Sequence, residues 1–326
     1  MNIATEADAL VSIVIPVYNG ANYLGQAIDS ALDQTYPHCE VIVVNDGSND
    51  NGQTERIALD YGDRIRYFTK PNGGVSSALN LGLSVMRGSL FSWLSHDDLY
   101  EVKKIERQCF ILLNSPRDDI VVYSDYYIFS DNDRHCTIRL QDTNPEAFRY
   151  RLARHSNVNG CTLLIRADTL RAIGGFNEAL RATQDYEMWF RLARQQTFIH
   201  LPEVLVGSRF HGQQGIHTQT ELAEIEYQSL HAMFAKELHD YEIPTLPGKS
   251  PNRVLNELGR SFWGRGFREA ALIAQQRALN HGAPPLQKYI SKWAGWMHYM
   301  ISLLLRRTLD ASTRAHFRQR LTALFR

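Results

Sequence analysis

The stretch Leu90-Phe91-Ser92-Trp93-Leu94-Ser95-His96-Asp97-Asp98 joins an apolar segment directly to two adjacent carboxylates. Its first five residues have the composition of a buried strand, which in an open α/β sheet lies near the centre. Ligands of such sheets bind beyond the carboxyl ends of the strands. Two carboxylates at that place suit a hard divalent cation that has oxygen ligands and binds phosphates. The alternative is a solvated Asp-Asp turn that caps a helix beginning near Tyr100.

The residues before this stretch alternate between strand patterns and helix patterns. Strands are predicted over 11–19, 40–48, 64–69 and 90–94, and helices over 23–32, 52–61 and 76–86. Pro16 is expected to break the first strand. Such alternation with short connections predicts βαβ units on a mostly parallel sheet. Because right-handed crossovers bring the loops after the strands to one edge, we expect Asp46, the Asn72–Gly74 turn and the Asp97-Asp98 pair in one crevice.

Composition excludes several classes of protein. The chain has 326 residues, 44% hydrophobic and 21% charged, with a formal net charge of zero. This is typical of a folded protein, and zero net charge provides no general attraction to nucleic acid, so no nucleic-acid partner is expected. The four cysteines form no Cys-x-x-Cys pair, which argues against a zinc site or a disulfide framework. No apolar run reaches the roughly 18–20 residues that span a bilayer, and residues 1–10 do not have the pattern of a signal peptide.

Two nucleotide-binding fingerprints are missing from the sequence. No Gly-x-Gly-x-x-Gly follows the first predicted strand, where Pro16–Asn19 stands instead, which disfavours a nicotinamide-dependent dehydrogenase. There is no Gly-x-x-x-x-Gly-Lys-Ser/Thr loop, which excludes P-loop chemistry. A nucleotidyltransferase would need a Gly-rich loop bearing Arg or Lys after the first strand, and none is present.

Seven blocks of sequence together resemble a known family. They are Ser12–Asn19 (SIVIPVYN), Val43–Ser48 (VVNDGS), Asn72–Asn80 (NGGVSSALN), Ser95–Asp98 (SHDD), Gly160–Arg166 (GCTLLIR), Gly174–Trp189 with its Gly-Gly-Phe-Asn and Gln-Asp-Tyr-Glu-Met-Trp motifs, and Arg209–His211 (RFH). In this order and spacing they resemble family 2 glycosyltransferases of the GT-A fold. The resemblance implies a GT-A catalytic domain over residues 1–218, with a Rossmann-like and mostly parallel sheet. The helical pattern of the residues after it predicts an all-α region over 219–326.

The resemblance implies a donor site for a nucleotide-sugar, most simply a UDP-sugar. It assigns donor binding to residues at the strand ends, namely Pro16, Tyr18, Asp46, Asn72, Gly74 and Asp97. Asp46 would accept a hydrogen bond from the N–H of the base, although an Asp at this place can also simply form a turn. Tyr18 would stack on the base, and Asp97 would contact the ribose.

The resemblance also implies a metal cofactor, Mg²⁺ or Mn²⁺, with Asp98 and His211 as ligands. The ion would bridge the two phosphates and stabilise the departing diphosphate. Ser95 stands where the family often has another acid, so the carboxylates are fewer here. His96 is interpreted as a filler position. For His211 the alternative is an ordinary surface histidine.

Asp185 is the candidate general base. It lies at the start of an amphipathic helix, where an Asp is also explained as a cap. The resemblance implies that Asp185 deprotonates the acceptor hydroxyl in a single displacement that inverts the anomeric carbon. Glu187 ranks second as a base. No Gln-x-x-Arg-Trp block follows Asp185, which favours the addition of one sugar per encounter.

The region after residue 219 has helical spacing of its apolar residues. Residues 252–284 carry small and apolar side chains at the offsets of one tetratricopeptide-type helix pair, which we expect to pack against the catalytic domain. Residues 286–326 are predicted to form basic amphipathic helices, since eight Lys and Arg follow Pro284 against one acid, Asp310. Such helices with tryptophans lie on anionic membranes, and the alternative is packing on the domain or in a dimer.

The sequence therefore predicts a metal-assisted inverting glycosyltransferase. It would be a hexosyl- or N-acetylhexosaminyltransferase that moves one sugar from a nucleoside-diphosphate donor to a hydroxyl of a glycan or lipid-linked acceptor. We expect it in the cytoplasm, in peripheral contact with the anionic inner face of the cytoplasmic membrane. The alternative is a catalytically silent module of the same fold that binds glycans or a partner protein.

Overall fold

The computed structural model describes residues 9–130, 133–140, 144–155, 157–211, 220–243, 250–284, 292–293, 296–297 and 299–300. The chain divides into two units, residues 1–226 and 227–326. The domain boundary predicted at 218/219 lies outside the described residues. The basic amphipathic helices predicted over 286–326 also lie outside them, apart from the six residues between 292 and 300.

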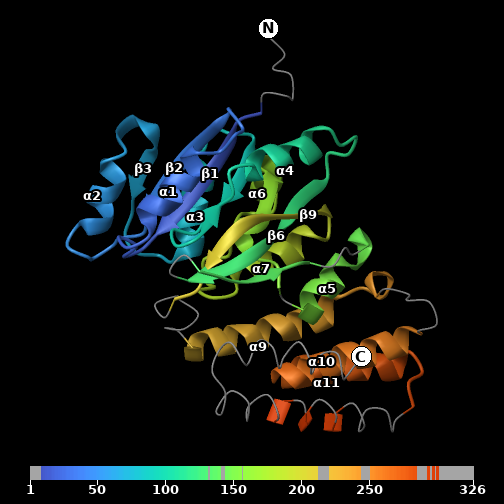
Figure 1. Ribbon diagram of the computed structural model, residues 1–326. Coiled ribbons are helices and arrows are strands. Elements are labelled where there is room, and N and C mark those ends of the chain that lie inside the picture. Colours follow the sequence, from blue (N-terminus) through green and yellow to red (C-terminus); the bar gives the residue numbers. More distant parts are fainter. Residues whose placement is uncertain are drawn as a thin grey trace. The chain divides into compact units, whose positions relative to one another are not determined.

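The described part of the first unit contains a mixed, mostly parallel sheet of nine strands (Figure 1). The strands are β1 (Val11–Val17), β2 (Cys39–Asn45), β3 (Arg66–Thr69), β4 (Leu90–Trp93), β5 (Leu99–Tyr100), β6 (Ile120–Ser130), β7 (Asp133–Ile138), β8 (Leu163–Arg166) and β9 (Thr197–Arg209). Their order is β3-β2-β1-β4-β8-β6-β9-β5, with β7 paired to β6. The first four strands in this order are mutually parallel, so their carboxyl ends meet at one edge.

Helices cover both faces of this sheet. They are α1 (Leu24–Leu32), α2 (Gln53–Leu59), α3 (Val75–Val85), α4 (Lys104–Leu113), α5 (Phe148–His155), α6 (Ala167–Ala172) and α7 (Gln184–Leu192), with short 3₁₀ turns at Gly62–Arg64, Pro145–Ala147 and Gly160–Thr162. The odd-numbered residues of β1 share one buried cluster with α1 and α4. On the opposite face Gly82 of α3 lies directly against Val14. Strand β1 is therefore buried on both sides, as its β-branched sequence predicts.

Pro16 does not break the first strand, contrary to the sequence-based expectation. Strand β1 continues to Val17, and Pro16 lies opposite Val44 of β2. The other neighbour, β4, pairs with β1 only as far as Val14. Pro16 therefore lies beyond the last rung of that ladder, and its missing N–H costs no hydrogen bond there.

The Asp97-Asp98 pair does not cap a helix, so that alternative is wrong. Leu99 and Tyr100 form strand β5, which pairs with Gly207 and Val206 of β9. The next helix, α4, begins only at Lys104. The two carboxylates instead lie in a tight connection between two strands of the sheet, where backbone from β9 can reach them.

The described part of the second unit is helical. Helix α9 (Thr220–Glu237) continues into it from the first unit, and the 3₁₀ turn Asp240–Glu242, α10 (Pro251–Arg265) and α11 (Arg268–Asn280) follow. The helices α10 and α11 lie side by side and are joined at Gly266, whose φ of 87° is left-handed (Figure 1). This pair occupies the predicted 252–284 segment, while its tetratricopeptide character stays a prediction. None of the helices in the described part of the chain is long and apolar enough to cross a membrane.

Candidate active site

Asp46 anchors the turn that leads into α3. Its Oδ1 accepts hydrogen bonds from the Gly73 N–H (2.9 Å) and from Lys70 Nζ (2.8 Å), and its Oδ2 accepts from the Gly74 N–H (2.7 Å). Asn72 Nδ2 donates to the Asp46 carbonyl oxygen at 3.0 Å. The predicted donor residues Asp46, Asn72 and Gly74 thus form one network at the sheet edge. Lys70, which the sequence analysis missed, partly neutralises the buried carboxylate.

Gly74 has a backbone conformation that favours glycine. Its φ is 87°, and a Cβ atom there would collide with the guanidinium of Arg181. Arg181 lies four residues before Asp185 and is exposed. No hydrogen bond or ion pair of its guanidinium with another side chain is present among the described residues. Sequence reasoning missed Arg181, since nothing in its local pattern shows that it reaches the Asn72–Gly74 turn.

The first strand ends beside this network. Pro16 is buried, whereas the Tyr18 ring is 43% exposed and available for stacking. Asn19 has a left-handed φ of 51° and makes three hydrogen bonds to the loop after β2. Its N–H donates to Ser48 Oγ, its Nδ2 donates to Asn49 Oδ1, and its Oδ1 accepts from the Asn49 N–H. The loops after β1 and β2 are therefore hydrogen-bonded to each other, and the exposed Tyr18 side chain projects from the first of them.

Asp98 is only 4% exposed, and both of its oxygens face protein groups. The Arg209 backbone N–H donates to Oδ1 at 2.9 Å, and the Cys161 thiol donates to Oδ2 at 3.4 Å. Burial, reinforced by the neighbouring Asp97 carboxylate, raises the pKa of Asp98 well above its ordinary value. The Arg209 side chain is also engaged, since its Nε donates to the Asp97 carbonyl oxygen at 2.9 Å.

Asp97 and His211 form a pair at the same edge. His211 Nε2 lies 2.9 Å from Asp97 Oδ2, and the ring packs against Tyr23 with centroids 5.0 Å apart. The other ring nitrogen, Nδ1, is buried and has no hydrogen-bond partner within the described residues. No cluster of three or more His, Cys, Asp or Glu side chains that could hold a metal occurs in the described part of the chain. The Asp97 carboxylate and the His211 imidazole, with its unsatisfied Nδ1, nevertheless fit a divalent ion that also takes phosphate oxygens as ligands.

Asp185 occupies the first turn of α7, one residue after the helix begins. Thr183 is at the N-cap position, and Tyr186 N–H donates to Asp185 Oδ1 at 2.8 Å. Oδ2 has no hydrogen-bond partner among the described residues. Burial raises the pKa of Asp185 to about 6, against the opposing effect of the Tyr186 N–H. One oxygen is thus fixed and the other is able to accept a proton.

Glu187, the second candidate base, is occupied by an ion pair. Arg191 Nε and Nη2 each lie 2.9 Å from a different oxygen of Glu187. The same guanidinium donates to the Gly175 carbonyl oxygen at 2.9 Å. Glu187 therefore holds the Gly-Gly turn through Arg191, an arrangement that leaves Asp185 as the better placed base.

Aromatic packing links α7 to the end of β4. Phe176 contacts Trp93 on one side and Trp189 of α7 on the other, with ring centroids 6.1 and 6.2 Å apart. In the loop before α7, Arg181 lies against Gly74 of the Asn72–Gly74 turn. The structure thus connects Asp185 to both groups of predicted residues, through Arg181 to the Asn72–Gly74 turn and through Phe176 to the end of β4.

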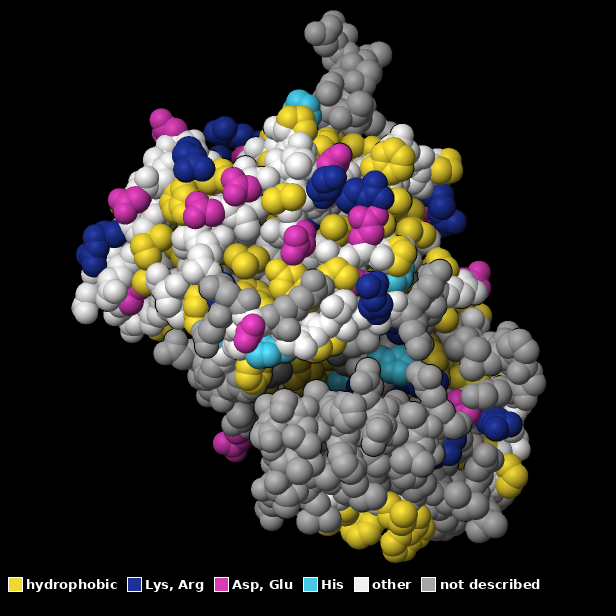
Figure 2. All heavy atoms as spheres, viewed as in Figure 1, with side chains coloured by type: hydrophobic (Ala, Val, Ile, Leu, Met, Phe, Trp, Pro, Cys, Tyr) yellow, Lys and Arg dark blue, Asp and Glu magenta, His cyan; other side chains and the backbone are white. Residues whose placement is uncertain are grey.

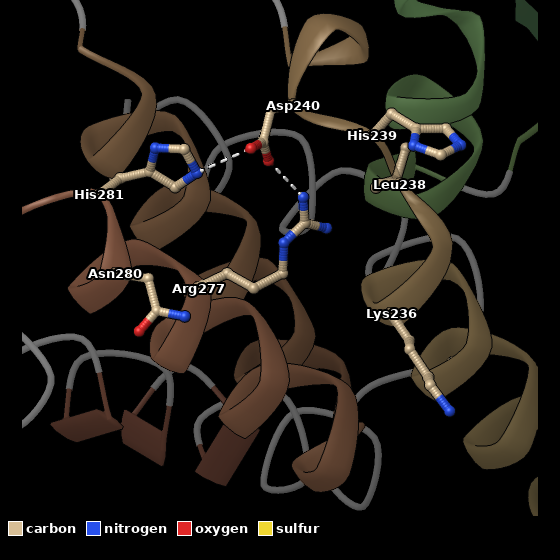
Figure 3. A pocket seen from close by; sticks show the side chains of 7 residues that line it. All are labelled: Lys236, Leu238, His239, Asp240, Arg277, Asn280 and His281. Atoms are coloured by element: carbon tan, nitrogen blue, oxygen red, sulfur yellow. Dashed lines mark hydrogen bonds and ion pairs between the residues drawn. The ribbon is translucent and has the colours of Figure 1, made fainter.

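A polar pocket in the second unit lies outside this site (Figure 3). Its carboxylate, Asp240, accepts a hydrogen bond from Arg277 Nη2 at 2.7 Å and pairs with His281 at 3.2 Å. Hydrogen bonding from Arg277 holds the pKa of Asp240 below its ordinary value. These groups satisfy one another near the ends of α9 and α11, where cations are favoured by the helix dipoles.

Comparison with known proteins places the chain in a family. The model of glycosyl transferase family 2 matches residues 12–174, which contain the β1–β4 edge with Asp46, Asp97 and Asp98. The chain is a family 2 glycosyltransferase. An uncharacterized glycosyltransferase of Rickettsia typhi is 43% identical to it over 269 residues, 81% of this chain and 83% of the relative. Another of Rickettsia felis is 49% identical over 63% of this chain, which corresponds to 35% of that longer relative. The chondroitin synthase of Pasteurella multocida is 34% identical over 62% of this chain and 21% of its own length.

Solved structures confirm the predicted GT-A fold of this family 2 glycosyltransferase. Residues 1–349 of S. aureus TarS in complex with UDP-GlcNAc match with a TM-score of 0.60 at 15% identity, covering 89% of each chain. The mannosyltransferase PcManGT of Pyrobaculum calidifontis, in complex with GDP-Man and Mn²⁺, matches with a TM-score of 0.55 at 17% identity, covering 93% and 88%. The predicted membership of the chain in glycosyltransferase family 2 and its mostly parallel sheet are therefore both confirmed.

Proposed function

We propose that this family 2 glycosyltransferase moves one hexose or N-acetylhexosamine from a UDP-linked donor to a hydroxyl of a glycan or lipid-linked acceptor, with inversion. The observation that carries the proposal is the state of Asp185. Its Oδ1 is fixed by the Tyr186 N–H, its Oδ2 has no hydrogen-bond partner within the described residues, and its pKa is raised to about 6. These are the properties of a general base that works near neutral pH.

In the proposed reaction the acceptor oxygen forms a bond to the anomeric carbon while the bond from that carbon to the diphosphate breaks. Asp185 Oδ2 takes the proton that the acceptor hydroxyl loses. The exposed Tyr18 ring stacks on the base of the donor, and the turn held by Asp46 lines the nucleotide side. UDP-GlcNAc bound to the TarS neighbour supports a UDP-linked donor and an N-acetylhexosamine.

We further propose that Asp97 and His211 are the ligands of the Mg²⁺ or Mn²⁺ ion. The buried Asp98 would support them by holding the backbone at Arg209. The sequence analysis assigned the ion to Asp98 and the ribose to Asp97. Exchange of these roles is supported by the burial of Asp98 between Arg209 N–H and Cys161, and by the pairing of Asp97 with His211. A bound ion would neutralise charge on the departing diphosphate. The Mn²⁺ in the PcManGT complex is consistent with this cofactor.

The membrane association expected from the sequence also remains a proposal. Within the described residues near the C-terminus, apolar side chains with 37–63% exposure are clustered, namely Trp293, Trp296, Met297 and Met300. Figure 2 shows a group of exposed hydrophobic side chains where Figure 1 draws the short helical fragments of residues 292–300. Tryptophan next to Lys292 is the combination that favours an anionic membrane interface.

The function is tested with a panel of UDP-, GDP- and dTDP-sugars, with transfer and donor hydrolysis measured for the wild type and for Asp185→Asn. We expect one UDP-sugar to be turned over, at a rate that rises as the pH increases through about 6, because Asp185 must be ionised to act as base. Asp185→Asn should lower kcat by about 10²–10⁴ and leave donor affinity unchanged.

Glu187→Gln is the matched control for this experiment, because it removes the neighbouring carboxylate of the same helix turn. If Glu187→Gln abolishes transfer while Asp185→Asn does not, the base is Glu187. Donor binding without turnover by the wild type, with any acceptor or water, would establish the silent binding module instead.

A further inference from the structure

Glu226, on α9, makes a set of contacts that no local sequence pattern predicts. Its Oε1 accepts the Arg181 N–H at 2.8 Å, and its Oε2 accepts the Ala182 N–H at 2.9 Å and the Thr183 N–H at 3.2 Å. The Thr183 hydroxyl donates to the same Oε2 at 3.2 Å. One side chain, only 8% exposed, therefore satisfies three successive backbone donors just before α7.

These contacts replace the usual cap of α7. Thr183 stands at the N-cap position, but its side chain accepts no hydrogen bond from the helix. Its hydroxyl is turned to Glu226 instead. A carboxylate beside a helix N-terminus is stabilised by the partial positive charge of that end. Buried N–H groups without a partner would destabilise the loop, so removal of this carboxylate releases the segment 181–183.

The same loop is held at its other end by α3. Asn80 Oδ1 accepts the Phe176 N–H at 2.8 Å, and Asn80 Nδ2 donates to the Phe176 carbonyl oxygen at 2.9 Å. Between these two attachments, the loop brings Arg181 against Gly74 of the donor turn. Asp185 follows two residues after the last amide bound by Glu226. The position of Asp185 therefore depends on contacts from Glu226 and Asn80, which lie outside α7.

We propose that Glu226 is a positioning residue that fixes the loop 181–183 and thereby the orientation of Asp185 in the transfer reaction. This inference rests on the proposed role of Asp185 as the base. Glu226 acts through the backbone amides of residues 181–183 and the Thr183 hydroxyl, which its carboxylate binds. Small displacements of a reacting group can cost about 10²-fold in rate, so a loosened loop lowers kcat more than it changes donor binding.

The test compares Glu226→Gln with Glu224→Gln in the full chain. Gln keeps the size of Glu226 but offers only one acceptor oxygen to the amides, and its NH₂ group opposes the remaining N–H donors. Glu224 lies on the same helix, is exposed, and loses the same charge. We expect Glu226→Gln to lower kcat about 10- to 100-fold with the donor KM within about twofold, and Glu224→Gln to behave as wild type.

Two readouts do not depend on turnover. Hydrogen exchange at the amides of residues 181–183 should be at least about tenfold faster in Glu226→Gln than in Glu224→Gln. The pKa of Asp185, followed by the carboxyl ¹³C shift, should move from about 6 toward its ordinary value as water reaches the loosened loop.

Unchanged exchange at 181–183 and an unchanged Asp185 titration in Glu226→Gln would overturn the proposal. A lower Tm with unchanged kcat per folded molecule would show a purely structural role and would also overturn it. If the wild type turns over no donor while both readouts respond to Glu226→Gln, the proposed function fails and the positioning of Asp185 by Glu226 stands.

Discussion

For Asp185, the proposed base, the raised pKa comes at some expense of stability. Its folded pKa of about 6 lies above the roughly 3.9 of an unfolded Asp. The folded state therefore holds this proton more tightly, and the side chain favours folding below about pH 3.9. That contribution is lost as the pH rises through about 6, where Asp185 becomes the ionised, half-buried group that a base must be.

The division of work between Asp97 and Asp98 can be tested by two isosteric variants. In Asp98→Asn the new amide oxygen can still accept the Arg209 N–H, so this variant should keep the Mn²⁺-dependent rise in Tm caused by UDP. Asp97→Asn removes the carboxylate beside His211 and should abolish that rise while the protein stays folded. The measurement is Tm with UDP, with and without Mn²⁺ and a chelator.

The opposite pattern, with the metal effect lost only in Asp98→Asn, would restore the assignment made from the sequence. An equal UDP effect in the presence of chelator would contradict a metal at either residue.

The sequence motifs name the residues of the candidate site, but they do not give the contacts among them. The motifs name Asp46, Asp97, Asp98, Asp185 and His211, because each lies at a strand end or helix start. What decides their roles is contact across long separations in the chain. Asp98 meets the Arg209 backbone 111 residues away, and the Arg181 backbone meets Glu226 45 residues away. No local pattern encodes such contacts.

At the level of secondary structure, β1 to β4 and the intervening helices follow their hydrophobic periodicity closely. The two errors have a common cause. Pro16 stays in β1 because β4 stops pairing with it at Val14, and Leu99–Tyr100 become a strand because β9 lies beside them. In both cases the outcome depends on where a neighbouring strand begins or ends, which periodicity within one segment cannot show.

The turn that opens α3 gives an element-level prediction. Gly74→Ala introduces a Cβ at a φ of 87° and pushes it into the Arg181 guanidinium. We expect a loss of about 1–3 kcal/mol in stability from the backbone alone, and weaker donor binding, because Arg181 and the Asn72–Gly74 turn are displaced. Thermal unfolding and titration with UDP measure the two effects.

Gly62→Ala is the control for this prediction, since Gly62 has a φ of 53° and open space around it. It should lose stability of the same order without a change in UDP affinity. Equal UDP affinity in Gly74→Ala and wild type would show that the turn does not contribute to the donor site.

The whole molecule combines a fold that the motifs identify with a C-terminal region that they do not describe. Blocks near strand ends suffice to recognise the GT-A unit, because ligand-binding loops of a parallel sheet recur at fixed places. Helical spacing indicates α10 and α11, but it does not say what the exposed apolar residues beyond them contact.

Binding to membranes is predicted to depend on Trp293 and Trp296, which are 63% and 44% exposed and lie edge to face with centroids 5.8 Å apart. Their replacement by Ser should weaken binding to anionic vesicles at least about tenfold, since interfacial tryptophans anchor a helix and each nearby Lys or Arg adds roughly 1 kcal/mol. The control is Leu272→Ser on α11, which removes an apolar side chain of similar exposure, 46%, from the same unit. Vesicle co-sedimentation at low and moderate salt, with anionic and with neutral lipid, measures the effect. Equal vesicle binding by the Trp293/Trp296 double variant and by Leu272→Ser would show that this cluster serves another partner. A molecular mass that changes with protein concentration would then identify a second copy of the chain as that partner.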